Sequence, residues 1–106
     1  MRVGMVVGKV SLQRVHPSMV GKRYVLIQSL GLKALAGGEQ SPPEEIVAVD
    51  ELGVTLGTRV GFSEGAEASA PFAPEKKPVD AYAGCIIEEI NIDRALATTL
   101  MEGKQP

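Results

Sequence analysis

Aromatic residues are scarce in this chain of 106 residues, which has two tyrosines, two phenylalanines and no tryptophan. Proteins that bind single-stranded nucleic acids or sugars usually stack them on flat aromatic side chains, so the scarcity argues against such a surface. Cysteine and histidine are scarcer still, with one residue of each. A single thiol cannot form an internal disulfide or a multi-thiolate metal site, and we expect neither.

Long hydrophobic runs are also missing, because the longest fall far short of the roughly 18 residues that a membrane-spanning helix needs. The segment from Met1 to Met5 has no charged stretch followed by an unbroken apolar core, so no secretory signal is predicted. Hydrophobic residues make up 44% of the chain and charged residues 23%, as in ordinary globular domains. We expect one soluble domain in the cytoplasm, with no membrane partner.

No set of catalytic residues is evident. His16 precedes Pro17 at a predicted turn and has no neighbouring partner for general-base or metal chemistry, so a turn role is expected. Cys85 lies in an apolar run that suppresses the thiolate, which favours a packing role in the core. No Gly-x-Gly-x-x-Gly or Gly-Lys-Ser/Thr motif follows a strand. The chain is therefore predicted not to be an enzyme and to need no metal or other cofactor.

Adjacent acids could suggest paired carboxylates. The pairs are Glu44-Glu45, Asp50-Glu51 and Glu88-Glu89. Neighbours in a strand point to opposite faces and cannot converge on one bond, so we interpret these pairs as solvated edges.

Charge is unevenly distributed along the chain. The first 38 residues hold six bases and no acid, whereas the rest holds five bases and thirteen acids. The six bases are Arg2, Lys9, Arg14, Lys22, Arg23 and Lys33. Two explanations stay open: basic and acidic strands are neighbours within one sheet, or complementary faces meet between neighbouring subunits.

The strand pattern begins with a valine-rich run from Arg2 to Val15. Its apolar residues change from odd to even positions near Gly4 and Gly8. A strand that changes its buried face near glycine is bent or bulged, and such bends close small barrels. The pattern therefore predicts a barrel rather than a flat sheet.

Four further strands are predicted, at 23–28, 46–50, 58–62 and 83–92. Turns at 17–21 and 53–57 and exposed loops at 31–45 and 63–78 separate them. After the last strand, Asp93 can cap a short helix that Gly103 ends, with an apolar stripe of Leu96 and Leu100 that needs a cover. We predict an all-β fold: a small five-stranded barrel over residues 1–92 and a short C-terminal helix and tail over 93–106.

Three stretches with proline, glycine and aspartate punctuate this pattern. The first is the turn Pro17-Ser18-Met19-Val20-Gly21. The second runs from Val47 to Gly57 and includes Asp50, Gly53 and Gly57. The third is Pro78-Val79-Asp80-Ala81, and a shorter stretch, Gly65-Ala66-Glu67-Ala68-Ser69, precedes it.

In this order and spacing, the stretches resemble the EutN/CcmL family of bacterial microcompartment vertex proteins over roughly residues 1 to 92. The chain departs from the family pattern at a few positions. These are Val15, Thr55, Thr58, Ser69 and Cys85. Ser69 stands where the family has an arginine, and Cys85 where glycine is usual.

The resemblance implies a five-stranded barrel of oligonucleotide-binding-like (OB-like) topology, assembled as a cyclic pentamer that closes the five-fold vertices of a microcompartment shell. The implied partners are further copies of this chain and hexameric shell proteins, without nucleic acid. The implied turn and assembly positions are Pro17, Ser18, Gly21, Asp50, Gly53, Gly57, Gly65, Pro78, Val79, Asp80 and Ala81. A closed ring uses different faces of each subunit, which fits the uneven charge.

The alternative from another class is a single-stranded nucleic-acid-binding OB-fold module. The basic first third of the chain is the argument for it. The few aromatic residues and the net charge of -2 argue against it.

Overall fold

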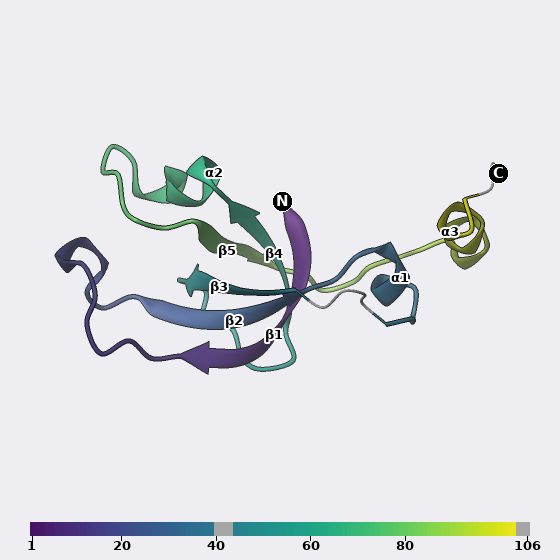
Figure 1. Cartoon of the computed structure of the whole chain (residues 1–106), viewed down its shortest axis with the longest axis horizontal. Coiled ribbons are helices and arrows are strands. Elements are labelled where there is room, and N and C mark those ends of the chain that lie inside the picture. The colour runs from purple at the N-terminus through teal and green to yellow at the C-terminus, as the bar shows by residue number, and fades with distance from the viewer. Residues whose placement is uncertain (40–43, 104–106) are drawn as a thin grey trace.

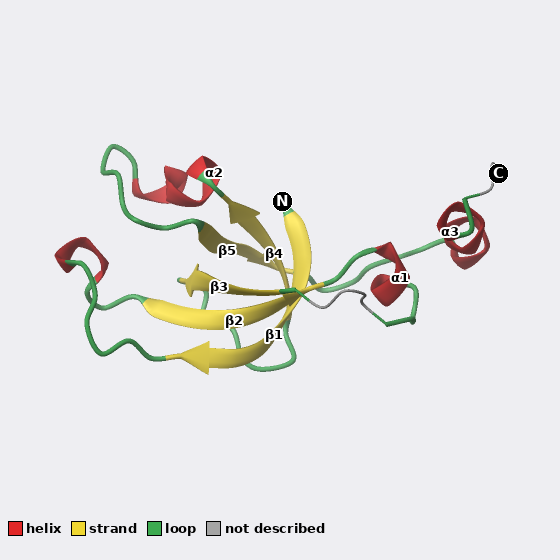
Figure 2. Ribbon diagram, in the orientation of Figure 1, coloured by secondary structure: helices red, strands yellow, loops and turns green. Residues whose placement is uncertain are grey.

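The computed structural model describes residues 1–39 and 44–103 and shows a closed five-stranded barrel decorated with short helices (Figure 1, Figure 2). The strands are β1 (Arg2–Val10), β2 (Arg23–Ser29), β3 (Glu45–Asp50), β4 (Arg59–Glu64) and β5 (Ala81–Ile86). The helices are η1 (Pro17–Met19), α1 (Leu32–Leu35), α2 (Ala66–Ser69), η2 (Ala70–Phe72) and α3 (Arg94–Met101), where η marks a 3-10 turn. The predicted small all-β barrel with a C-terminal helix is confirmed.

The barrel closes in the order β1, β2, β3, β5, β4, and β4 pairs back with β1. Neighbouring strands are antiparallel, apart from the parallel pair β3 and β5. That parallel pair is short and joins Val49 to Tyr82 and Asp50 to Ala83. Since every strand has two neighbours, the barrel has no terminal strand, and the short β3–β5 ladder is the one that closes it least fully.

The predicted bend in β1 is a β-bulge. Val6 pairs with Ile27 and Gly8 pairs with Leu26, so Val7 is an extra residue between two consecutive partners in β2. A bulge of this kind bends the strand and increases its twist. The switch of apolar residues from odd to even positions near Gly8 therefore corresponds to the bulge that bends β1 and helps to close the barrel.

Small and branched side chains fill the barrel interior around one phenylalanine. The buried cluster is Val6, Val25, Ile27, Ala48, Val54, Val60, Phe62 and Ala81. Gly4 forms part of the wall that faces Ile27 and Phe62, and a Cβ built at this position would overlap Ile27 and lie 3.0 Å from Phe62 Cε1. Glycine here lets the core side chains approach the backbone of β1 closely.

Two strands end earlier than the sequence predicted. β1 ends at Val10, which pairs with Tyr24, and not at Val15. β5 ends at Ile86, which pairs with Val60 near the start of β4, and not at Ile92. A strand continues only while a neighbouring strand accepts its hydrogen bonds, and here the partner strands begin at these points.

Both predicted loops contain short helices. The loop at 31–45 includes α1, and its Pro42-Pro43 portion lies outside the described residues. The loop at 63–78 contains α2 and η2, and the expectation that it is exposed is wrong for Ala68, which is fully buried. Alanine is small enough to bring this loop into contact with the barrel, and α2 packs on β4 and β5.

The predicted terminal helix is present as α3. The Asp93 carboxylate accepts a hydrogen bond from the Leu96 amide at 2.9 Å, and Gly103 follows with a φ of 75°. α3 packs against α1 at one end of the molecule, opposite the turn that contains η1 (Figure 1). Residues 104–106 of the predicted tail lie outside the described residues.

Candidate functional site

The sequence-predicted turn positions lie in, or at the ends of, three of the connections between strands. The first is the β1–β2 turn with Pro17, Ser18 and Gly21, the second is the β3–β4 turn with Asp50, Gly53 and Gly57, and the third is the β4–β5 loop with Gly65, Pro78, Val79, Asp80 and Ala81. Gly21, Asp50 and Gly53 line one groove of about 440 Å³. Turns that are about 30 residues apart in sequence therefore form one surface.

The β4–β5 loop is held closed at its base. The Gly65 amide donates to the Asp80 carbonyl at 2.9 Å, and Gly65 has a φ of 66°. Ala81, the first residue of β5, is buried. Gly57 lies elsewhere, because its amide donates to the Val6 carbonyl at 2.8 Å beside the β1 bulge.

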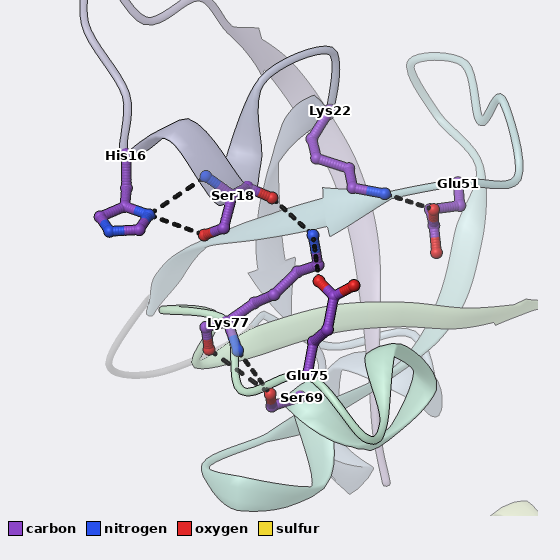
Figure 3. A network of polar contacts seen from close by, with 7 residues as sticks. All are labelled: His16, Ser18, Lys22, Glu51, Ser69, Glu75 and Lys77. Atoms are coloured by element: carbon purple, nitrogen blue, oxygen red, sulfur yellow. Dashed lines mark hydrogen bonds and ion pairs between the residues drawn. The ribbon is translucent and has the colours of Figure 1, made fainter.

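His16 has the turn role that the sequence predicted. Its Nδ1 accepts a hydrogen bond from the Ser18 amide at 3.1 Å and lies 2.7 Å from Ser18 Oγ (Figure 3). These contacts cap η1, and Met19 at the end of η1 is buried. The histidine therefore organises the turn and has a satisfied Nδ1.

Asp50 organises the second turn from the inside. Its carboxylate accepts hydrogen bonds from the Leu52 amide at 2.8 Å and the Val54 amide at 2.9 Å. Arg23 Nη2 lies 3.6 Å from the same carboxylate and donates to the Val54 carbonyl at 3.0 Å. Gly53 completes the turn with a φ of 76°, a conformation that glycine adopts without strain.

The interpretation of the adjacent acids needs one correction. Glu51 is exposed, but Asp50 is buried rather than at a solvated edge. Glu44 is exposed and paired, because Arg2 donates to both of its carboxylate oxygens at 3.2 and 2.9 Å. The buried carboxylate is tolerated because two amides and a guanidinium surround it.

Glu51 links the first and second turns to β5. Its carboxylate accepts hydrogen bonds from Lys22 Nζ at 3.0 Å and from the Tyr82 hydroxyl at 2.7 Å. The hydrogen bond to Glu51, reinforced by burial, raises the pKa of Tyr82 to about 12. The hydrogen bonds from Tyr82 and Lys22 lower the pKa of Glu51.

Phe72 and Lys77 join the β4–β5 loop to this surface. The Phe72 ring packs edge-on against Tyr82, with ring centres 5.6 Å apart. Lys22 Nζ and Lys77 Nζ lie 4.7 and 5.5 Å from the Phe72 ring centre, within the range of cation–π attraction. Lys77 Nζ also donates to the Ser18 carbonyl at 2.6 Å and lies 3.4 Å from Glu75 (Figure 3). The three connections thus form one contact network at one end of the barrel.

Ser69, where the resemblance led us to expect an arginine in relatives, makes a local contact in this chain. Its hydroxyl accepts a hydrogen bond from the Lys77 amide at 3.3 Å and donates to the Lys77 carbonyl at 3.4 Å (Figure 3). The serine thereby holds the segment whose lysine reaches Ser18.

A tyrosine titration tests the Tyr82–Glu51 contact. In a Tyr24→Phe variant, which leaves Tyr82 as the one tyrosine of the chain, we expect a tyrosinate absorbance midpoint of about 12. Glu51→Gln should move the midpoint down towards the ordinary value of about 10. The raised pKa means that the contact stabilises the fold fully below pH 10 and that this contribution is lost as the pH rises through about 12. A folded protein with Glu51 and a midpoint near 10 would contradict the contact.

The uneven charge is partly explained within one chain. Arg2 pairs with Glu44 and Glu64, Lys22 with Glu51, and Arg23 with Asp50. Within residues 1–39 and 44–103, Lys9, Arg14 and Lys33 have no ion pair. Neighbouring segments of one chain therefore account for three of the six bases, and the described residues supply no ion pair to the other three.

Cys85 is not a core residue. It is half-buried, and its Sγ lies 3.9 Å from Met1 Sδ. A Cβ at Gly61 would lie 2.7 Å from Cys85 Sγ, so the thiol packs against β4 on the outside of the cluster. The predicted packing role holds for the barrel wall and is wrong for the core.

The described residues offer little for chemistry beyond packing and charge. Among them, no group of three or more histidine, cysteine or acidic side chains could hold a metal ion. No helix of this part of the chain is long and apolar enough to cross a membrane.

Sequence reasoning missed the residues that carry the contact network. These are Lys22, Glu51, Phe72, Lys77 and Tyr82. Their contacts join positions that are far apart in sequence, which no local pattern reveals. One signal was available, because a phenylalanine within an alanine- and proline-rich loop indicates that the loop packs on something.

The comparisons with known proteins agree with the barrel and its turns. The family model described as "Ethanolamine utilisation protein EutN/carboxysome" matches residues 1–88. The chain belongs to the EutN/CcmL family. It is 37% identical over 93 residues to the carboxysome shell vertex protein CcmL of Gloeobacter violaceus, and the match covers 88% of each chain.

Solved structures of relatives have the same EutN/CcmL barrel. The structure of Gloeobacter violaceus CcmL matches with a TM-score of 0.76 and 35% identity, over 89% of this chain and 92% of that chain. GrpN, a pentameric microcompartment shell protein from Rhodospirillum rubrum, matches with a TM-score of 0.71 and 23% identity, over 87% of this chain and 98% of that chain. At the lower identity the likeness is one of fold.

Proposed function

We propose that this protein is a structural, non-enzymatic shell component that assembles as a homopentamer and closes the five-fold vertices of a bacterial microcompartment in the cytoplasm. The observation that carries the proposal is the 37% identity to a carboxysome shell vertex protein over 88% of both chains. The family match over residues 1–88 supports it, because it includes all five strands and the three connections.

The geometry suits a rigid building block. A closed barrel has fixed shape, and the contacts of Lys22, Lys77 and Phe72 hold its longest loop against it. Outward positions on the strands carry apolar side chains, with Val47 44% and Ile86 54% exposed. A ring of identical subunits would bury such positions between neighbours, using two different faces of each subunit.

We also propose that the ring contacts hexameric shell proteins, that residues 1–92 form the shell domain, and that residues 93–106 are an appendage to it. The turn positions from Pro17 to Ala81 support subunit shape through the backbone and side-chain contacts described above. The nucleic-acid alternative has less support, since Arg2, Lys22 and Arg23 are engaged in ion pairs within the chain.

The mass of the native protein tests the ring. Light scattering at micromolar concentration should give about five times the monomer mass of 11.2 kDa. A monomer or dimer under these conditions would overturn the proposal.

A further inference from the structure

We propose that the C-terminal arm, residues 88–103, docks on the β1–β2 hairpin of a neighbouring copy of this chain. The proposal rests on the ring of the proposed function and adds a second contact between its subunits, beside the apolar strand faces. The family model ends at residue 88, so all of the arm after Glu88 lies beyond the part of the chain that the family model matches.

The arm leaves the barrel without pairing to it. The last backbone hydrogen bond to the barrel runs from the Ile87 amide to the Arg59 carbonyl, at 2.9 Å. Within the described chain, no backbone amide of residues 88–92 donates a hydrogen bond. Figure 1 shows this stretch running away from the strands towards α3. Extended backbone with open donors is ready to bind a surface that the chain itself does not supply.

The helix at the end of the arm has an uncovered apolar face. Leu96, Leu100 and Met101 are 40%, 50% and 42% exposed, whereas Ala97 is buried. α3 has only eight residues, and helices of this length depend on packing of their apolar face. With α1 packed against α3, these three side chains are still 40 to 50% exposed, so a second surface is needed to cover them.

The distribution of unpaired charges indicates which surface of a neighbouring copy the arm binds. In the described structure, the arm's Glu88, Glu89 and Asp93 have no ion pair, and neither do Lys9 and Arg14 of the hairpin. The hairpin also carries a groove of about 410 Å³, whose lining includes Lys9, Leu12 and Val15. Leu12 and Val15 are 48% and 36% exposed. An arm that is apolar and acidic thus matches a groove that is apolar and basic.

The arm cannot fill the groove of its own chain. The molecule measures 50 × 26 × 24 Å, and the β1–β2 turn and α3 lie at opposite ends of its longest axis (Figure 1). The contact must therefore join two copies. It uses a different surface on each copy, and contacts of this type form a ring when the rotation between neighbours closes.

The apolar half of the contact is tested by Leu96→Ser/Leu100→Ser and by a chain that ends at Glu88, which keeps all five strands. Sedimentation over a dilution series should show the subunit concentration for half-dissociation raised at least about tenfold in both. The control Ala95→Ser/Thr98→Ser alters exposed positions of the same helix and should leave assembly unchanged.

The charged half is tested by reversal. Glu88→Lys/Glu89→Lys and Lys9→Glu/Arg14→Glu should each weaken assembly, and an equimolar mixture of the two proteins should regain it. Rings that persist at unchanged concentrations in the truncated chain would overturn the arm contact and leave the proposed function standing. Weakening without rescue in the mixture would overturn the hairpin as the acceptor. An unmodified protein that is monomeric would overturn both proposals.

Discussion

Alanine in place of Gly4 is expected to destabilise the barrel by about 3 kcal/mol, because overpacking a closed core forces its neighbours to move. The added Cβ would overlap the Ile27 side chain and lie 2.9 Å from the Gln28 carbonyl oxygen. It would also lie 3.0 Å from Phe62 Cε1. Ile27 and Phe62 are fully buried, and the Gln28 carbonyl is part of the β-ladder. None of these three groups can therefore move aside without a substantial cost in free energy.

Urea denaturation followed by circular dichroism measures the effect as a lower midpoint. Gly8→Ala is the matched control in the same strand, since its Cβ would meet Leu26 at 3.4 and 3.7 Å, close to ordinary van der Waals contact. We expect that control to change the free energy of unfolding by less than about 1 kcal/mol. Equal effects of the two substitutions on the free energy of unfolding would show that the close contacts at Gly4 do not contribute to the stability of the barrel.

Removal of the Asp50 carboxylate is the second large effect. Asp50→Ala leaves the Leu52 and Val54 amides without their acceptor, and Asp50 and Val54 are themselves buried. Hydrogen bonds to a charged group contribute about 1.5 to 3 kcal/mol each, so we expect a loss of about 3 kcal/mol in unfolding free energy. The loss should be accompanied by faster amide exchange at Leu52 and Val54, which locates it in the turn.

Glu45→Ala provides the comparison, because it removes an exposed acid from the same strand. Its effect should stay within about 0.5 kcal/mol. If Asp50→Ala were equally mild and both amides kept their protection, the carboxylate would not be what holds the turn. Since the groove beside this turn is also lined by Gly21 and Lys22, a loosened turn should also disturb the adjoining end of the barrel.

The sequence predicted the turns of the candidate surface more fully than its contacts. Pro17, Gly53 and Gly65 were found because proline and glycine satisfy local backbone geometry, and their neighbours in sequence are enough to recognise it. The links from Lys77 to Ser18 and from Glu51 to Tyr82 span 59 and 31 positions, and no spacing rule connects such residues. The packed state of the 63–78 loop was missed for the same reason.

The strand ends also show which features local sequence predicts and which depend on tertiary contacts. Alternation of apolar residues marked both β1 and β5, but each stopped where its partner strand began, at Val10 and Ile86. Ile87 still bonds to Arg59, and residues 88–92 form part of the arm because the barrel has no neighbouring strand left for them.

By itself the sequence determined a single small β-barrel with a bend near Gly8, capped turns and a helix that starts after Asp93, because alternation, glycine and capping act over a few residues. Its motifs also pointed to the correct family. Only the tertiary structure decided that Asp50 is buried, that half of the N-terminal bases are neutralised inside the chain, and that the apolar face of α3 stays uncovered. Burial and ion pairing depend on which distant segments of the chain come into contact when the barrel closes. Local sequence patterns do not specify those contacts.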